Sequence, residues 1–436
     1  MQNGYRQYDG NEEVVDKKAI VLRATDTVSV FINNLATYSF DASFVLPVES
    51  LGAEYIIQTD KQSASNNFNS YMKETSAFLI VAVEDDTEVE ITPSVKTLTG
   101  HGAGVSYTVM LSAGQTYFVK SNNDLEWRDL SGSTIFARNG KKIAVFNGNA
   151  ITRIPGDATN GRDHIFEQAL PIDSLGRRFV ITSSEGRSRD IVKITSSADD
   201  NYIYRDGEEI AIIGYGESWE FDLSGEDGSC FVETSEPSVV YVYHTSWQDP
   251  FEPSSSRLGN PSMVWIPPVE QRIKALTFCT FNSEQNFGSI ANHYVNVVVH
   301  RLDADKLYID GELVSSSELR PVTGSDDGMN TEESRCKKVS PVYLTGRGND
   351  FTAYFYESPQ TKGSPEHAVV MSGTLSSNCI KDFVYGYKIM RYNDSIVSPV
   401  AYPVNSIFIL KDCDGLAETC TWFNDTLFHP QNNLMP

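Results

Sequence analysis

The stretch that decides the fold is Leu46-Pro47-Val48-Glu49-Ser50-Leu51-Gly52. It recurs after 170 − 46 = 124 residues as Leu170-Pro171-Ile172-Asp173-Ser174-Leu175-Gly176. Both copies of this proline motif keep the same order of apolar residue, proline, apolar residue, acid, serine, leucine and glycine. A match of this length indicates that the chain contains internal repeats. A weaker third copy, Ile266-Pro267-Pro268-Val269-Glu270, lacks the Leu-Gly ending.

Each proline motif predicts a strand end followed by a shaped turn. Proline has no backbone N–H and therefore ends central strand pairing. The acid and the serine offer side-chain acceptors to the backbone of a turn. We expect the leucine to plug an apolar gap and the glycine to supply a permissive φ. A β-rich segment follows each full copy, at residues 54–57 and 178–181.

Other segments show β-branched or aromatic runs on both sides of a polar turn, which is typical of β-hairpins. Four such hairpins are expected, at residues 19–31, 133–146, 230–243 and 342–356. Two further strand pairs are expected around glycine-containing turns. These pairs join residues 107–111 to 115–119 and residues 209–213 to 218–223.

An acidic pair precedes an alternating strand within each repeat. In residues 87–91 the apolar side chains are two apart, which predicts one buried face and one solvent-facing face. The acidic pairs are Asp85 with Asp86, Asp199 with Asp200, and Asp303 with Asp305.

These patterns predict an all-β chain of three tandem β-sandwich-like repeats that share a recurring hairpin. The alternative arrangement is a propeller-like closed β ring. The segment 376–436 differs in pattern, and we expect its strands to cover the exposed edge of the first hairpin. The predicted divisions are an N-terminal hairpin of an incomplete repeat at 1–43, repeats at 44–165, 166–262 and 263–375, and a cystine-bearing tail at 376–436.

Composition limits the classes of partner. The 436 residues, 40% of them hydrophobic, suffice for a sizeable core, and the net charge is 35 − 58 = −23. Nucleic acid and anionic membrane surfaces bind clustered Lys and Arg, so we expect neither as a partner. No apolar run is long enough to insert into a membrane. Residues 1–20 are polar and show no secretory signal, which leaves a cytosolic protein or a processed form.

The C-terminal segment favours an extracellular location. Cys413 and Cys420 close a short loop, and we expect a disulfide between them. Asn393 and Asn424 each begin an N-glycosylation sequon. We therefore expect a secreted or cell-surface glycoprotein.

The chain lacks the common motifs of catalysis: nucleophile elbow, zinc helix, phosphate loop and dinucleotide-binding glycines are all missing. The acidic pairs recur once in each repeat, which favours a structural role in turns, because a single active site would not need three copies. Calcium is the alternative at Asp85, Asp86, Asp199, Asp200, Asp303 and Asp305, since hard oxygen ligands suit it. We expect no other cofactor.

Aromatic side chains are the other candidates for binding. Trp219, Tyr243 and Trp247 are proposed to stack on a ligand, although strand aromatics more often belong to the core. Trp247 lies in a segment rich in Pro and Ser and is the best candidate.

Several phrases together resemble the N-terminal domain family of IgGFc-binding protein. They are LPVESLG, AVEDDTEVEITP, LSAGQTYFVKS, DLSGSTIFARNGKKIAVFNGNA and HIFEQALPIDSLGRRFVI. The resemblance implies a secreted or surface-exposed recognition domain without catalytic residues. Cysteine-dense von Willebrand D-type modules follow this domain in the namesake and are absent here, so the resemblance implies no mucin cross-linking.

We therefore predict a non-enzymatic recognition or adhesion module that binds an extracellular protein or a glycan. One alternative is a structural subunit of matrix or filament that self-associates through β edges. The other is an enzyme whose site is built from loop carboxylates.

Overall fold

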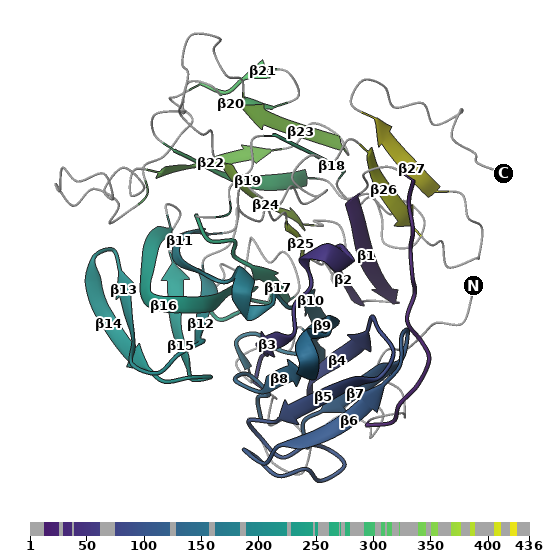
Figure 1. Ribbon diagram of the computed structural model, residues 1–436. Helices are drawn as coiled ribbons and strands as arrows, with labels where there is room; N and C mark the ends of the chain where they lie inside the picture. Colours follow the sequence, from purple (N-terminus) through teal and green to yellow (C-terminus); the bar gives the residue numbers. More distant parts are fainter. Residues whose placement is uncertain are drawn as a thin grey trace.

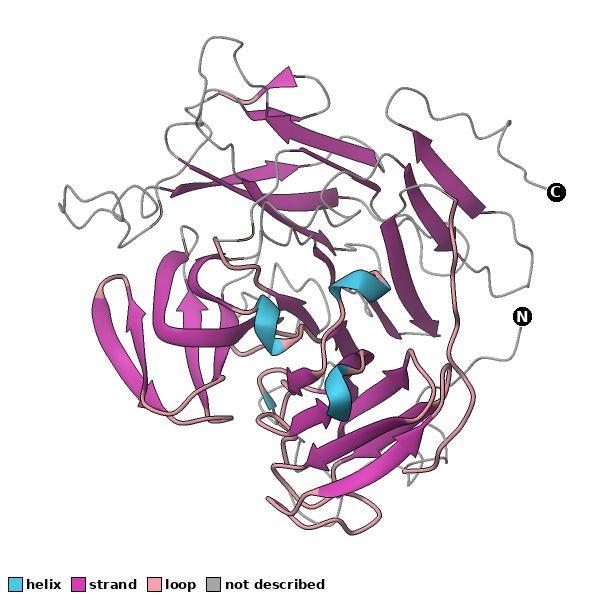
Figure 2. Ribbon diagram, viewed as in Figure 1, coloured by secondary structure: helices cyan, strands magenta, loops and turns pink. Residues whose placement is uncertain are grey.

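The computed structural model describes most of residues 13–300 and a series of strands beyond them. The described ranges are 13–25, 29–36, 39–61, 75–122, 128–156, 162–183, 189–224, 228–246, 249–251, 261–269, 271, 275–279, 292–300, 307–309, 312–315, 322, 339–345, 350–355, 368–375, 384–388, 405–410 and 419–424. Strands dominate them, and the helical elements are turns of three residues (Figure 2). The all-β prediction is confirmed. None of the described helical elements could cross a membrane.

Repeat 1 is a pair of four-stranded antiparallel sheets. One has the order β10-β9-β4-β7 and the other the order β3-β8-β5-β6. Their strands are β3 (Glu54–Ile56), β4 (Ser76–Ala82), β5 (Thr87–Thr92), β6 (Tyr107–Leu111), β7 (Thr116–Lys120), β8 (Thr134–Ala137), β9 (Ile143–Thr152) and β10 (Asp163–Gln168).

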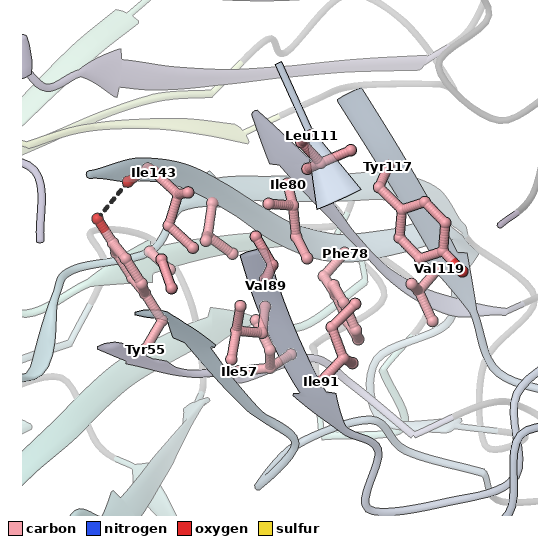
Figure 3. Packing of buried hydrophobic residues seen from close by; sticks show 14 of the residues in the cluster. Tyr55, Ile57, Phe78, Ile80, Val89, Ile91, Leu111, Tyr117, Val119 and Ile143 are labelled. Carbon is pink, nitrogen blue, oxygen red and sulfur yellow. Dashed lines mark hydrogen bonds between the residues drawn. The ribbon is translucent and has the colours of Figure 1, made fainter. Parts of the chain in front are cut away.

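The core of repeat 1 lies between these sheets (Figure 3). Phe78 and Ile80 of β4 and Val89 of β5 belong to one buried cluster. The hydroxyl of Tyr55 donates to the carbonyl of Ile143 at 2.6 Å, which joins the two sheets by a hydrogen bond. The predicted alternation in β5 is confirmed, because its burial alternates along the strand.

Repeat 2 has the same strand order within one curled seven-stranded sheet. The order β11-β16-β13-β14 corresponds to one sheet of repeat 1 and β17-β16-β12-β15 to the other. The halves are continuous because β16 is a single strand of 16 residues where repeat 1 has the separate strands β8 and β9. The strands are β11 (Gly176–Thr182), β12 (Arg189–Ser196), β13 (Asn201–Arg205), β14 (Glu208–Ile213), β15 (Ser218–Ser224), β16 (Ser229–His244) and β17 (Ser262–Trp265). A second core fills this unit.

Repeat 3 shows the arrangement again, in the sheets β18-β23-β20-β21 and β22-β19-β24-β25. The strand β25 lies within residues 376–436 but pairs with β24. The strands are β18 (Ala275–Cys279), β19 (Asn292–His300), β20 (Leu307–Ile309), β21 (Glu312–Leu313), β22 (Val339–Thr345), β23 (Asp350–Phe355), β24 (Ala368–Leu375) and β25 (Val384–Lys388).

The two ends of the chain form one sheet of order β2-β1-β26-β27. Val30 of β1 pairs in parallel with Ile407 of β26, so a strand of the tail covers the edge of the first hairpin, as the sequence predicted. The strands are β1 (Ser29–Ala36), β2 (Ser39–Val45), β26 (Asn405–Leu410) and β27 (Thr419–Asn424).

The innermost strand of each unit meets those of its neighbours. Strand β2 contacts β10, β10 contacts β17, β17 contacts β25, and β25 contacts β2. Figure 1 shows these four strands near the middle of the molecule, with the other strands of their sheets outside them.

The proline motifs form 3-10 turns at the junctions between repeats. The first is η1 (Val48–Ser50) and the second is η4 (Ile172–Ser174), each beginning after an extended proline. In both, the serine N–H donates to the proline carbonyl at 2.9 Å.

Leu51 and Gly52 play different parts in the first motif. Leu51 is buried, as the sequence predicted for a side chain that fills an apolar gap. Gly52 does not have the left-handed φ that its type allows, so the predicted reason for this glycine was wrong. It is needed for space instead, because a Cβ at this position would lie 2.4 Å from the Cβ of Pro171 in the next motif.

Several predicted hairpins were wrong in their pairing. Strands β8 and β9 follow one another but belong to different sheets, as do β22 and β23, and β6 and β7. Strands β14 and β15 lie at opposite ends of one path through the seven-stranded sheet and do not pair. Residues 230–243 fall inside the single strand β16. The first hairpin is formed by β1 with β2 and not by residues 19–31. Alternation of side chains identifies strands but not the strands with which they pair. A turn that leads from one sheet to the sheet packed against it, here called an arch, has the same sequence pattern as the turn of a hairpin.

Residues 13–25 form an extended strap on the outer edge of repeat 1. Asp16 pairs with Thr116 of β7, and the N–H of Glu13 donates to the carbonyl of Phe118. Glu13 also pairs with His101 at 3.2 Å. The strap therefore covers the β7 edge, which would otherwise invite pairing with another chain.

Replacing Gly52 by alanine should destabilise the protein by about 1–3 kcal/mol, because a methyl group has to be forced against Pro171. Chemical unfolding would measure the change. Gly102→Ala is the matched control, since its nearest neighbour would be the side chain of Val105 at 3.4 Å. Equal stability of the two variants would contradict the close contact between the motifs.

Candidate functional site

A cluster of charged side chains lies between repeats 1 and 2, around the buried amine of Lys193. The loop after β3 supplies Gln58, Thr59 and Asp60 from repeat 1, and Asp129 comes from the segment before β8. Opposite them, β12 of repeat 2 contributes Lys193. We call this set, together with Glu220 of β15, the junction cluster.

Lys193 is the centre of the junction cluster. Its side chain is 3% exposed, although lysine is almost never fully buried without a partner. The amine contacts Oδ2 of Asp129, lies 3.3 Å from Oε1 of Glu220 and donates to the carbonyl of Thr59 at 3.0 Å. Three oxygens from two repeats therefore surround one ammonium group.

The other carboxylate oxygen of Asp129 is also held. Its Oδ1 accepts hydrogen bonds from Thr59 Oγ1 at 2.5 Å, from Ser131 Oγ at 2.7 Å and from the Ser131 N–H at 2.9 Å. The two oxygens consequently have different environments. Hydrogen-bond donors hold Oδ1, and the amine of Lys193 faces Oδ2.

The two charged partners stabilise each other's ionised form. Burial alone would lower the pKa of Lys193, but the charges of Asp129 and Glu220 raise it above its usual value. Burial alone would raise the pKa of Asp129, but Lys193 and the hydrogen bonds to the carboxylate hold it below its usual value.

Asp60 behaves in the opposite way. Burial raises the pKa of this carboxyl to about 7, and the hydrogen bond from Thr152 and the charge of Lys193 offset only part of the effect. Thr152 Oγ1 donates to Asp60 Oδ2 at 2.6 Å, and Asn149 pairs with the Asp60 backbone in both directions. Because Asp129 and Glu220 already share the positive charge of Lys193, a third ionised carboxylate is disfavoured.

Neutral hydrogen bonds fix the geometry around these charges. Gln58 Nε2 donates to the carbonyl of Lys193 at 2.9 Å, and Gln58 Oε1 accepts from Thr195 at 2.8 Å. The hydroxyl of Tyr243 donates to the carbonyl of Thr59 at 2.9 Å. These bonds all cross from repeat 1 to repeat 2, so they set the position of one repeat against the other.

Sequence reasoning did not find the junction cluster, because its members are far apart in the chain and belong to no motif. The one local signal is Lys193 between two β-branched residues of a strand, since a charge within an apolar run needs a partner. Nothing in the sequence alone indicates that the partner is Asp129.

The aromatic candidates have different surroundings. Trp219 is 41% exposed on β15 and is available to a ligand. Tyr243 is 2% exposed, so stacking on a ligand would require the junction to open. Trp247 lies outside the described residues. Of the two described side chains, Trp219 is at the surface and Tyr243 is not.

The acidic turns make equivalent contacts in repeats 1 and 2. Asp85 Oδ1 accepts from the N–H of Ala113, and Asp199 Oδ1 accepts from the N–H of Tyr215, each at 3.0 Å. Both acceptors therefore hold the glycine-containing turn of their own repeat. The second acids, Asp86 and Asp200, have φ values of 52° and 54° at the turn itself.

Calcium at these turns remains a prediction. Asp85, Asp86, Asp199 and Asp200 are exposed, and Asp303 and Asp305 lie outside the described residues. Within the described part of the chain, no group of three His, Cys, Asp or Glu side chains is arranged to hold a metal ion.

The predicted disulfide and glycosylation sites also stay predictions. Cys413 and Asn393 lie outside the described residues, and for Cys420 and Asn424 only the backbone of β27 is described. Cys230 is a free buried thiol, and burial raises its pKa to about 12. It belongs to the core of repeat 2 and is not a reactive group.

Replacing Asp60 by asparagine should remove a pH-dependent loss of stability. The folded pKa of about 7 lies above the ordinary value of 3.8, so the stability linked to this proton is complete below pH 4 and is lost as the pH rises through 7. Because the side chain is only partly buried, we expect a gain of about 2 kcal/mol for Asp60→Asn at pH 8, roughly half of what such a shift gives a fully buried group.

Urea unfolding from about pH 3.5 to about pH 8 would measure this difference. This range spans the ordinary pKa of 3.8 and the raised pKa of about 7. The two proteins should be similar in stability at the lower pH and diverge at the higher one. Glu209→Gln, which changes an exposed carboxylate on β14 of repeat 2, is the control. Parallel curves for the Asp60 variant and the parent would rule out the assignment.

Comparison with known proteins places this fold in a family. A search of curated proteins finds no match. One similar solved structure is a beta-glucuronidase from glycoside hydrolase family 2, with 10% identity and a TM-score of 0.13 over 80% of this chain and 31% of the enzyme. So low a score carries no argument. The family model described as IgGFc binding protein matches residues 41–356, well over half of the sequence. The chain therefore belongs to the IgGFc-binding protein family.

Proposed function

We propose that this chain is an extracellular, non-enzymatic module of recognition or adhesion that binds a protein or a glycan. Membership of a family named for binding supports a binding role. The particular ligand does not follow from the family name, and immunoglobulin is one candidate among proteins.

The observation that carries the proposal is the exposure of Trp219 beside charged groups. The next residue in the sequence is Glu220, whose Oε2 lies 3.7 Å from the amine of Lys61 in repeat 1. An indole ring offers a large apolar face to a sugar ring or a side chain, and tryptophan is enriched among the residues that dominate binding energy. Charged groups next to the indole ring supply hydrogen bonds that orient a bound ligand.

Repeat 2 offers further apolar surface. Tyr202 and Ile212 are paired on neighbouring strands, and both are exposed, as is Tyr215 at the turn before β15. Rigid strands position these side chains without a loss of loop entropy on binding. We propose repeat 2 as the part of the chain that meets the ligand.

An enzyme is less well supported by the same residues. In the acidic turns, the carboxylates of Asp85 and Asp199 accept from backbone N–H groups. The carboxylates of the junction cluster are engaged with Lys193, Thr59 or Thr152. Catalysis would need some of these groups to face a substrate.

A structural subunit that assembles through β edges is the alternative. The strap of residues 13–25 covers the β7 edge of repeat 1, whereas β15, the corresponding strand of repeat 2, carries Glu220 and Asp222. Covered and charged edges are devices against edge-to-edge association. Light scattering of the purified protein over a range of concentrations would distinguish a monomer from an assembling subunit.

We further infer that the repeats close into a propeller-like ring, completed by β26 and β27 beside the first hairpin. The cyclic contacts of β2, β10, β17 and β25 support this arrangement. A ring would present the turns of successive repeats on the same face. A disulfide between Cys413 and Cys420, glycans at Asn393 and Asn424, and calcium at the acidic turns are parts of the same proposal for a secreted protein.

Replacing Trp219 by alanine should weaken ligand binding about tenfold or more, because truncation of a central tryptophan commonly costs over 1.4 kcal/mol. A glycan array and a panel of immobilised extracellular proteins would identify the ligand, and titration would give the affinities of the variants. Phe136→Ala is the matched control, since Phe136 is 42% exposed on repeat 1 and Trp219 is 41% exposed.

Equal binding by the parent and the Trp219 variant would exclude this ligand surface. Failure of every glycan and every protein to bind, combined with concentration-dependent assembly, would favour the structural subunit instead.

A further inference from the structure

The amine of Lys193 and the carboxylate of Asp129 are arranged as the two halves of an amide bond. Lys193 Nζ contacts Asp129 Oδ2 in an environment where the lysine side chain is 3% exposed. The amine belongs to repeat 2 and the carboxylate to repeat 1, so their contact joins two separately packed units. Proximity of this kind replaces a bimolecular encounter with a reaction inside one molecule.

The carboxylate is held in a way that distinguishes its two oxygens. Three donors, from Thr59 Oγ1, Ser131 Oγ and the Ser131 N–H, converge on Oδ1. Attack of an amine on the carboxyl carbon creates negative charge on one oxygen, and preorganised donors stabilise that charge. Oδ1 is therefore suited to become the amide oxygen, and Oδ2 to leave as water.

A second carboxylate is placed to carry protons. Oε1 of Glu220 lies 3.3 Å from Lys193 Nζ. The ammonium of Lys193 has no lone pair, so it has to give up a proton before it attacks. A carboxylate at this distance can accept that proton and release it to the departing oxygen, which is general acid–base catalysis. An ordinary surface ion pair would need neither this second carboxylate nor the donors around Oδ1.

We propose that Lys193 and Asp129 condense to form an intramolecular isopeptide bond between repeats 1 and 2. The ammonium and the carboxylate together become an amide and one water molecule. The Nζ–Cγ bond forms and the Cγ–Oδ2 bond breaks. Two protons leave the nitrogen with the departing oxygen, and the third stays on the amide. The reaction is balanced without an oxidant, a reductant or any other reactant.

The surrounding hydrogen bonds favour the condensed form. Gln58 holds the backbone carbonyl of Lys193, and Tyr243 holds the carbonyl of Thr59, which in turn accepts from the Lys193 amine. Effective molarities of about 10⁵ M or more for well-oriented groups offset the excess of water that favours hydrolysis. The bond would cross-link residues 64 positions apart in the sequence.

Mass spectrometry of the intact, denatured protein tests the proposal directly. The parent should be lighter than its sequence mass by one water molecule, after allowance for disulfides. Proteolysis should yield a branched peptide in which the segment containing Lys193 is joined to the segment containing Asp129. Lys193→Arg is the matched control, because arginine keeps the charge but its guanidinium does not form the amide.

Two further variants report on the chemistry. Asp129→Ala should have its full sequence mass, whereas Asp129→Asn should lose ammonia in place of water, since an amide side chain has a different leaving group. Freshly purified Glu220→Gln should contain a larger fraction of chains without the cross-link than the parent, and this fraction should fall slowly during incubation in the folded state. These masses are read on unfolded chains, so a loss of stability in a variant does not affect them.

A parent protein of full sequence mass, with no branched peptide after prolonged incubation in the folded state, would overturn the proposal and leave an ion pair. So would a loss of water that maps to an Asp-Gly sequence, where cyclisation of the backbone to a succinimide gives the same mass change.

Discussion

The structure depends on the burial of one positive charge between two β units. Lys193 is surrounded by Asp129, Glu220 and the carbonyl of Thr59, and these groups come from both sides of the junction. Removal of one partner from a buried ion pair leaves an uncompensated charge, which commonly costs about 3–5 kcal/mol. The relative position of repeats 1 and 2 is therefore fixed by electrostatics, whereas the interior of each repeat is fixed by apolar packing.

The same junction is reinforced at the backbone by the proline motifs. The second motif lies against the first motif and the strand that follows it, because Pro171 is close to Gly52 and forms a bridge with Tyr55. The third lies against the strand that follows the second, because the N–H of Val269 donates to the carbonyl of Arg178. Each motif therefore begins one repeat and supports the start of the previous one, which explains why the motif recurs with the repeat.

The sequence predicted the class of the fold, the existence of repeats and the covering of β1 by a strand from the tail. It could do so because alternation in segments such as β5 and identity between the proline motifs are local signals. It could not predict which strands pair. The short polar turn between β8 and β9 is compatible with a hairpin within one sheet and with an arch between two sheets. Packing against the opposite sheet, which the sequence does not show, places the two strands in different sheets.

The candidate site shows the same limit. Exposure of Trp219 fits the sequence-based expectation, but Tyr243 is buried because its hydroxyl is used to hold the loop at Thr59. An aromatic residue in a strand has the same appearance in sequence whether it faces a ligand or a neighbouring repeat. The acidic turns were recognisable as turns because they recur, and Asp85 and Asp199 indeed bind equivalent backbone groups. The contacts of Lys193 with residues of repeat 1 correspond to no recurring pattern in the sequence, so they could not be predicted from it.

The fusion of two strands into β16 has an evolutionary consequence. In repeat 1, the break at Arg138–Gly140 separates the strands of the two sheets, so a gained or lost residue there can be absorbed by a turn. In repeat 2, Cys230 and Val232 share their side of one continuous strand with Val240 and Val242. A single-residue length change between them would turn one half of the core outward. Homologous chains should therefore vary in length at the first position and keep a constant length at the second.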